Sequence, residues 1–130
     1  MAVTNIINTL DTSKGWLQVQ NISGEHGAFI IGIKGSKSES DVMPTDKITE
    51  VVLELGIPSG IENKPITLQM VKLNFNDITS FDDADLNKTT AFTKVGPLPS
   101  TIYMRPVSFS DGYTTYKEGK ASIDINVLTF

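Results

Sequence analysis

The sequence ITLQMVKLNF at residues 66–75 alternates apolar and polar side chains, which is the pattern of a half-buried β-strand. Alternate side chains of a strand point to opposite faces, so the pattern predicts one apolar face against a core. The side chains expected on that face are Ile66, Leu68, Met70, Leu73 and Phe75, with Val71 as a further candidate. The alternation changes phase near Met70 and Val71, which predicts a β-bulge there.

The composition of the whole chain agrees with this local pattern. Its 130 residues include 14 Ile, 9 Val and 14 Thr, against only 5 Ala. β-branched side chains lose less conformational freedom in a strand than in a helix. The sequence therefore predicts an all-β fold.

Further strands are predicted at residues 16–22, 28–34, 48–55, 101–109, 113–117 and 122–130. The first two are separated by a Gly-containing turn, which predicts that they form a β-hairpin. Pro106 interrupts one strand and predicts either an edge strand or a bulge, and Asp111-Gly112 predicts a hairpin turn. About seven strands in a chain of this length predict a single antiparallel β-sandwich or a jelly-roll-like domain.

The two ends of the chain have different patterns. Residues 1–13 are polar with scattered apolar side chains, which predicts an N-terminal arm, either a short helical turn or an extended arm docked on a neighbour. Residues 14–130 are then the β domain, with a polar loop at 35–46 that is expected to be mobile. The strand at 122–130 has apolar side chains on both faces, which predicts a central or interface-forming strand.

Charge and cysteine content argue against several classes of protein. Eleven Lys and Arg against fifteen Asp and Glu give a net charge of −4, and Arg105 is the single arginine. Binding to nucleic acid or to an anionic membrane needs clustered cations, so neither a nucleic-acid nor a membrane partner is expected. The chain has no cysteine, no apolar run of membrane-spanning length and no secretory leader pattern, which predicts a cytoplasmic chain or a virion component assembled in a host cytoplasm.

Few residues are candidates for catalysis or metal binding. His26 is the single histidine and is expected to be a solvated turn residue. An acidic stretch offers the alternately spaced oxygen ligands that Ca²⁺ prefers, in Asp77, Asp82, Asp83, Asp85 and Asn87. An EF-hand would need Gly and Glu where Lys88 and Lys94 stand, so a solvated loop is the favoured interpretation and a Ca²⁺ site is the alternative.

Carboxylate pairs and aromatic residues complete the candidates. Asp82 with Asp85, or Glu50 with Glu54, contain the residue types of glycoside hydrolysis, but nothing singles them out. Four aromatic side chains are candidates for stacking on sugar rings, namely Trp16, Tyr103, Tyr113 and Tyr116. Of these, Tyr113 and Tyr116 beside a turn are expected to form the exposed platform.

The sequence therefore predicts a non-enzymatic structural protein with no catalytic, cofactor-binding or metal site and no cofactor. Its expected partners are copies of itself and a larger protein shell or tube, as in a phage-like virion component such as a capsid decoration or cement protein or a tail subunit. The predicted interfaces are the chain ends or an edge strand at 101–109. The alternative is a lectin-like module that binds glycans through Tyr113 and Tyr116.

Overall fold

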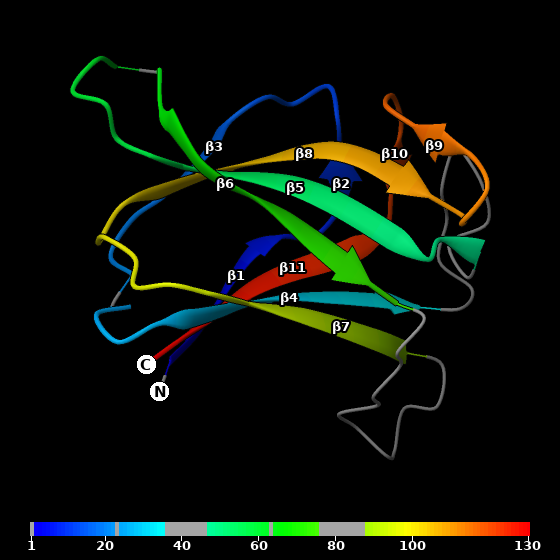
Figure 1. Cartoon of the computed structure of the whole chain (residues 1–130), viewed down its shortest axis with the longest axis horizontal. Coiled ribbons are helices and arrows are strands. Elements are labelled where there is room, and N and C mark those ends of the chain that lie inside the picture. Colours follow the sequence, from blue (N-terminus) through cyan, green and yellow to red (C-terminus); the bar gives the residue numbers. More distant parts are fainter. Residues whose placement is uncertain (1, 23, 36–46, 63, 76–87) are drawn as a thin grey trace.

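The computed structural model describes residues 2–22, 24–35, 47–62, 64–75 and 88–130 (Figure 1). It confirms the all-β class, because the described residues form eleven strands in three sheets with every pair of strands antiparallel. A strand number of about seven is not confirmed. The described residues include no helix that is long and apolar enough to cross a membrane.

One sheet has four strands and contains both ends of the chain. Its order is β1 (Ala2–Ile7), β11 (Ile123–Thr129), β4 (Ala28–Gly35) and β7 (Lys88–Val95). The first and last strands of the chain therefore lie side by side, and the two termini meet at one end of the molecule (Figure 1). The C-terminal strand was predicted to be central or interface-forming, and the first alternative is confirmed, because β11 lies between β1 and β4.

The second sheet has five strands. Its order is β3 (Leu17–Val19), β8 (Ile102–Ser110), β5 (Glu50–Ile57) and β6 (Ile66–Asn74), and β9 (Thr115–Tyr116) also pairs with β8. A third, two-stranded sheet joins β2 (Leu10–Asp11) to β10 (Lys120–Ala121). Strands β1, β2, β7 and β10 are the four that the sequence patterns did not predict.

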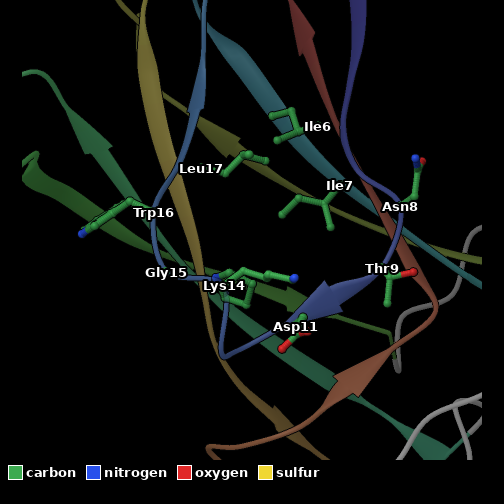
Figure 2. A pocket seen from close by; sticks show the side chains of 10 residues that line it. Ile6, Ile7, Asn8, Thr9, Asp11, Lys14, Gly15, Trp16 and Leu17 are labelled. Carbon is green, nitrogen blue, oxygen red and sulfur yellow. The ribbon is translucent and has the colours of Figure 1, made fainter. Parts of the chain in front are cut away.

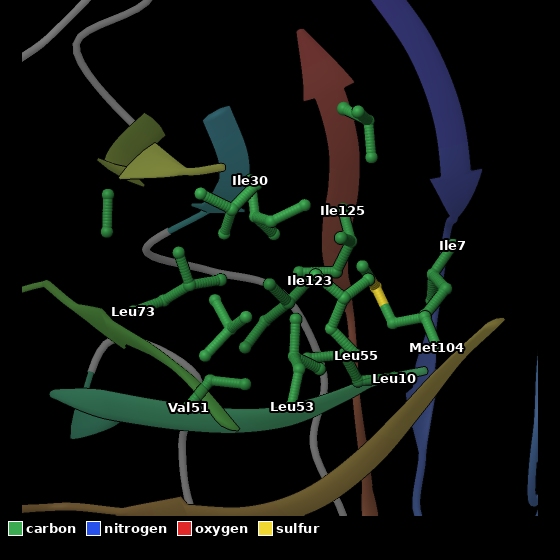
Figure 3. Close-up of a cluster of buried hydrophobic side chains, with 14 of the residues drawn as sticks. Ile7, Leu10, Ile30, Val51, Leu53, Leu55, Leu73, Met104, Ile123 and Ile125 are labelled. Carbon is green, nitrogen blue, oxygen red and sulfur yellow. The ribbon is translucent and has the colours of Figure 1, made fainter. Parts of the chain in front are cut away.

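The buried core draws side chains from both larger sheets (Figure 3). Val51, Leu53 and Leu55 of β5 are fully buried, and so are Ile123 and Ile125 of β11. The two sheets are also linked at their edges, where the Thr93 hydroxyl of β7 donates a hydrogen bond to the Lys72 carbonyl of β6. Burial of this apolar surface is the main favourable contribution to the stability of the fold.

The predicted hairpin of residues 16–22 and 28–34 is wrong. Strand β3 pairs with β8 in the five-stranded sheet, whereas β4 pairs with β11 and β7 in the other sheet. The turn between them therefore carries the chain from one sheet to the other. Short-range turn patterns cannot distinguish a hairpin from such a crossing, because the partner of a strand depends on distant residues.

The predicted orientation of β6 is wrong for Ile66, Leu68 and Met70, which are about half exposed. The expected burial of Leu73 and Phe75, and of the candidate Val71, is confirmed. The register shift lies opposite Leu55 and Gly56 of β5, rather than at Met70 and Val71. Both faces of β6 carry apolar side chains, so the sequence alternation alone could not identify the inner face.

Strand β8 is not an edge strand, since it lies between β3 and β5. The alternative interpretation of Pro106 is confirmed: Val52 pairs with Ser108 and Leu53 pairs with Pro106, which leaves Val107 as the extra residue of a bulge. A bulge accommodates a residue without an N–H inside a sheet.

The segment at 1–13, expected to be an arm, contains β1 and β2, which pair with β11 and β10 of the same chain. Docking of this segment on a neighbour stays a prediction. The loop expected to be mobile lies outside the described residues over positions 36–46, and its first residue, Gly35, belongs to β4.

Candidate functional site

The outward face of the four-stranded sheet carries a group of apolar side chains. Residues such as Ile30, Ile125 and Val127 point inward and are fully buried, so the residues between them in β4 and β11 point outward. We call this surface the outer apolar face, and its members are Val3, Phe29, Ile31, Phe92, Leu128 and Phe130. Val3 is 65% exposed and Phe92 is 48% exposed, so the face is open to solvent.

These side chains form one continuous surface across all four strands. Leu128 pairs with Val3 on one side and with Phe29 on the other, and Ile31 pairs with Phe92. The Phe29 ring lies 5.9 Å from the Phe92 ring in an edge-to-face arrangement, and also 5.9 Å from the Phe130 ring. Cross-strand contacts of this kind stabilise the sheet and hold the aromatic rings in place.

Polar groups on this face are few. The side-chain amide of Asn5 donates a hydrogen bond of 2.7 Å to the Asn126 side chain at the β1–β11 pair. Lys94 and Asp124 are the charged residues among the outward positions whose side chains the structure describes, and they lie on β7 and β11. Sequence reasoning identified the C-terminal part of this surface, but it did not predict β7 or its Phe92.

The outward face of the five-stranded sheet has a different chemistry. Arg105 of β8 forms an ion pair with Glu54 of β5, and the Thr67 hydroxyl donates to the same carboxylate. The Arg105 guanidinium also lies over the Trp16 ring, 4.7 Å from its centroid. Burial raises the pKa of Glu54, but the hydrogen bonds from Thr67 and Arg105 and the Arg105 charge outweigh burial, so the pKa lies below its ordinary value.

This ion pair bears on the carboxylate pair Glu50 and Glu54. Four residues along an extended strand separate the two by about 13 Å, which exceeds the roughly 5–9.5 Å between the two carboxyl groups of glycoside hydrolases. The Glu54 carboxylate instead forms an ion pair with Arg105 and accepts a hydrogen bond from the Thr67 hydroxyl. The second predicted pair, Asp82 and Asp85, lies outside the described residues.

A pocket of about 350 Å³ lies where β1, β2 and the start of β3 approach one another (Figure 2). It is lined by Ile6, Ile7, Asn8, Thr9, Asp11, Lys14, Gly15, Trp16, Leu17 and Pro106. Figure 2 shows the Trp16 ring pointing away from the Ile6 and Ile7 side chains, so it offers the pocket little stacking surface. The Asp11 carboxylate accepts hydrogen bonds from the hydroxyl and N–H of Ser13, which lower its pKa.

The aromatic candidates lie at two ends of β8. Tyr103 pairs with Gln18 and accepts a 3.1 Å hydrogen bond from its amide, whereas Tyr116 pairs with Phe109, about 20 Å further along β8. Tyr113 is 98% exposed in the hairpin turn between β8 and β9. The Asp111 carboxylate shapes this turn by accepting the N–H groups of Tyr113 and Thr114 at 2.9 and 2.8 Å.

The remaining predicted candidates contribute no assembled site. The His26 backbone N–H donates a 3.0 Å hydrogen bond to the Phe130 carbonyl, and its side chain is in an exposed turn. The acidic residues Asp77, Asp82, Asp83 and Asp85, together with Asn87, lie outside the described residues, so neither the favoured solvated loop nor the alternative Ca²⁺ site is tested. Over the described ranges, no three acidic, His or Cys residues group as a metal site would require.

Comparison with known proteins gives one limited similarity. No family model matches the chain. A stretch of 65 residues is 34% identical to autophagy-related protein 2 from two strains of the fungus Cryptococcus neoformans var. neoformans serotype D. The match covers 50% of this chain but only 3% of the length of each relative. It therefore assigns no family.

Proposed function

We propose that the protein is a non-enzymatic structural subunit that assembles by packing its outer apolar face against another copy of itself. The observation that carries this proposal is the continuous surface of Val3, Phe29, Ile31, Phe92 and Leu128, which faces solvent rather than the core. Contiguous apolar patches on a soluble domain are typical of interaction surfaces.

The arrangement of this surface supports a role in packing. It lies on paired strands rather than on loops, so the backbone hydrogen bonds of β4 and β11 hold its side chains in fixed positions. Aromatic residues are enriched in protein interfaces because they bury a large area with few rotatable bonds. Three of the six residues on the outer apolar face are phenylalanines.

We further propose that the two larger sheets form a β-sandwich. In this proposal the protein is a subunit of a phage-like particle, either a capsid decoration or cement protein or a tail or tube subunit. Its support is the combination of a small, acidic, cysteine-free β domain with an open packing surface. Such a subunit would recognise a larger protein shell in addition to its own copies.

Sedimentation velocity over a range of concentrations tests the proposal. We expect the wild-type chain to self-associate and Val3→Asp to shift it toward monomer, because the new carboxylate would be desolvated in the interface. Tyr113→Asp adds the same charge at an exposed turn of the other sheet and is expected to leave association unchanged. A wild-type chain that stays monomeric at all concentrations would contradict the proposal.

Carbohydrate binding is the second candidate, and the near-complete exposure of Tyr113 favours it. A ring held open to solvent by a hydrogen-bonded turn can stack on a sugar ring. A glycan array gives the test, with a signal expected to fall in Tyr113→Ala and Tyr116→Ala. An array without signal for the wild-type chain would exclude this candidate.

A further inference from the structure

We infer that two copies associate through a two-fold interface centred on Ile31, in which Lys94 of each copy forms an ion pair with Asp124 of the other. This inference rests on the proposed packing function and specifies its partner and geometry. It follows from the position of the two charged residues relative to the outer apolar face.

The strand register places Lys94 and Asp124 symmetrically around Ile31. On β4, Lys94 pairs with Phe29, two residues before Ile31, and Asp124 pairs with Ile33, two residues after it. Strands β7 and β11 lie on opposite sides of β4. The two charges are therefore at diagonally opposite corners of the outer face, with Ile31 midway between them.

This placement matches the requirement of a two-fold interface. In such an interface residue i of one copy contacts residue j of the other, and residue j contacts residue i. We place the two-fold axis between the two facing sheets, over Ile31 and perpendicular to the line that joins Lys94 to Asp124. Rotation about this axis brings Lys94 of each copy opposite Asp124 of the other copy. Ile31 then packs on Ile31 of the second copy, and two ion pairs form at the edges of the contact.

The charge balance of the molecule also favours this face. The chain has a net charge of −4, so two copies repel each other in most orientations. The described outward positions of this sheet carry one positive and one negative side chain, Lys94 and Asp124, which can pair across the interface. Complementary charges at the edge of an apolar contact select the orientation in which the copies meet.

Charge reversal tests the geometry. Lys94→Glu places two glutamates opposite two aspartates across the interface, and Asp124→Lys places two lysines opposite two lysines. We expect each variant to dimerise about 10–100-fold more weakly than wild type, because like charges facing each other across an interface oppose association. The double variant Lys94→Glu/Asp124→Lys is expected to restore wild-type association, because both pairs are again complementary.

Mixing the two single variants gives a more specific readout. In the heterodimer of Lys94→Glu with Asp124→Lys, the two substituted side chains face each other, and the native Asp124 of one copy faces the native Lys94 of the other. Both ion pairs are then complementary. We expect an equimolar mixture to form dimers at concentrations where each variant alone is monomeric, as measured by sedimentation velocity. Lys64→Glu, which reverses a charge at an exposed turn away from this face, is expected to leave dimerisation unchanged.

The outcomes distinguish this inference from the proposed function. A monomeric wild-type chain would overturn both. A wild-type dimer that tolerates Lys94→Glu and Asp124→Lys, or single variants that fail to form a heterodimer while circular dichroism shows them folded, would overturn the two-fold geometry and leave the packing function in place.

Discussion

Arg105 and Glu54 pair directly across strands β8 and β5, and their side chains form an ion pair on the outward face of the five-stranded sheet. The Glu54 side chain is 12% exposed, so its charge is largely removed from water, while the Arg105 side chain is 40% exposed. A carboxylate in such a position needs its cation and its hydrogen-bond donors. The stability of the fold should therefore depend on keeping Arg105 beside the Glu54 carboxylate.

The first prediction concerns the removal of Arg105. Arg105→Met retains much of the aliphatic contact but leaves the Glu54 carboxylate without its cation. We expect a loss of about 1–3 kcal/mol in the free energy of unfolding near pH 7, measured by urea denaturation. Glu54→Gln/Arg105→Met is the control, and it should recover most of this loss because no unpaired charge remains. Equal free energies of unfolding for wild type and Arg105→Met would show that the Arg105–Glu54 ion pair does not stabilise the fold.

The second prediction gives the pH dependence of this effect. The pKa of Glu54 in the folded chain lies below its ordinary value of 4.5, so its ionised form stabilises the fold above that value. This contribution is lost as the pH falls through the folded pKa. The stability difference between wild type and Arg105→Met should therefore be full at about pH 7 and shrink as the pH falls below 4.5 through the folded pKa of Glu54. A stability difference between the two proteins that grows as the pH falls would contradict a lowered pKa for Glu54.

The third prediction concerns close packing between the sheets at Gly32. A Cβ atom at this position would lie 2.8 Å from Cδ1 of Leu73 and 3.0 Å from Cζ of Phe75. Gly32→Ala should therefore lower the free energy of unfolding by about 1–3 kcal/mol through overpacking. Gly96→Ala is the matched control, because a Cβ there has no neighbour within 4 Å. Identical melting temperatures for the two variants would refute the predicted contact.

The fourth prediction uses Trp16 as a reporter, since it is the single tryptophan of the chain. A Cβ on Gly56 would lie 3.0 Å from the Trp16 ring, so Gly56→Ala should displace the indole from the sheet. We expect its fluorescence emission to shift to longer wavelength as the ring becomes more hydrated. Gly96→Ala should leave the emission unchanged. An unshifted spectrum in Gly56→Ala would mean that the ring does not rest on this glycine.

The fifth prediction concerns the last three residues of the chain. Leu128 and Thr129 pair with both β1 and β4, and the Phe130 N–H donates to the Gly27 carbonyl. Deleting residues 128–130 removes these backbone bonds and uncovers part of Phe29. We expect a loss of about 3–6 kcal/mol, seen as a lower melting temperature and reduced solubility. A truncated chain that melts within a degree or two of wild type would show that this end is only a tail.

Sequence patterns identified most of the strands but only one pairing between them, the β8–β9 hairpin at Asp111-Gly112, which is confirmed. Alternation located β3, β6 and β11 because the period of two follows from strand geometry itself. It missed β7, whose sequence KTTAFTKV has only Ala91, Phe92 and Val95 as apolar positions. Strand β7 is stabilised by its pairing with β4, and this pairing cannot be inferred from the residues of β7 alone.

The candidate site was predictable only in part. The apolar outer positions Leu128 and Phe130 were evident from the two-faced pattern of the C-terminal strand. Their association with Phe29 and Phe92 required the order β11–β4–β7, which brings together residues about 100 positions apart in the chain. The role of Glu54 was likewise hidden, because its partner Arg105 lies 51 residues further along the chain and no local pattern reports that β5 pairs with β8.

The all-β class and the positions of seven strands follow from the sequence alone, since both depend on local propensity and alternation. The pairing of strands beyond the β8–β9 hairpin, the buried face of β6 and the membership of the outer apolar face depend on tertiary contacts. A strand with apolar side chains on both faces satisfies the local pattern in either orientation. Which of the two faces is buried depends on the register of the strand with its neighbouring strands, and that register is a property of the whole sheet.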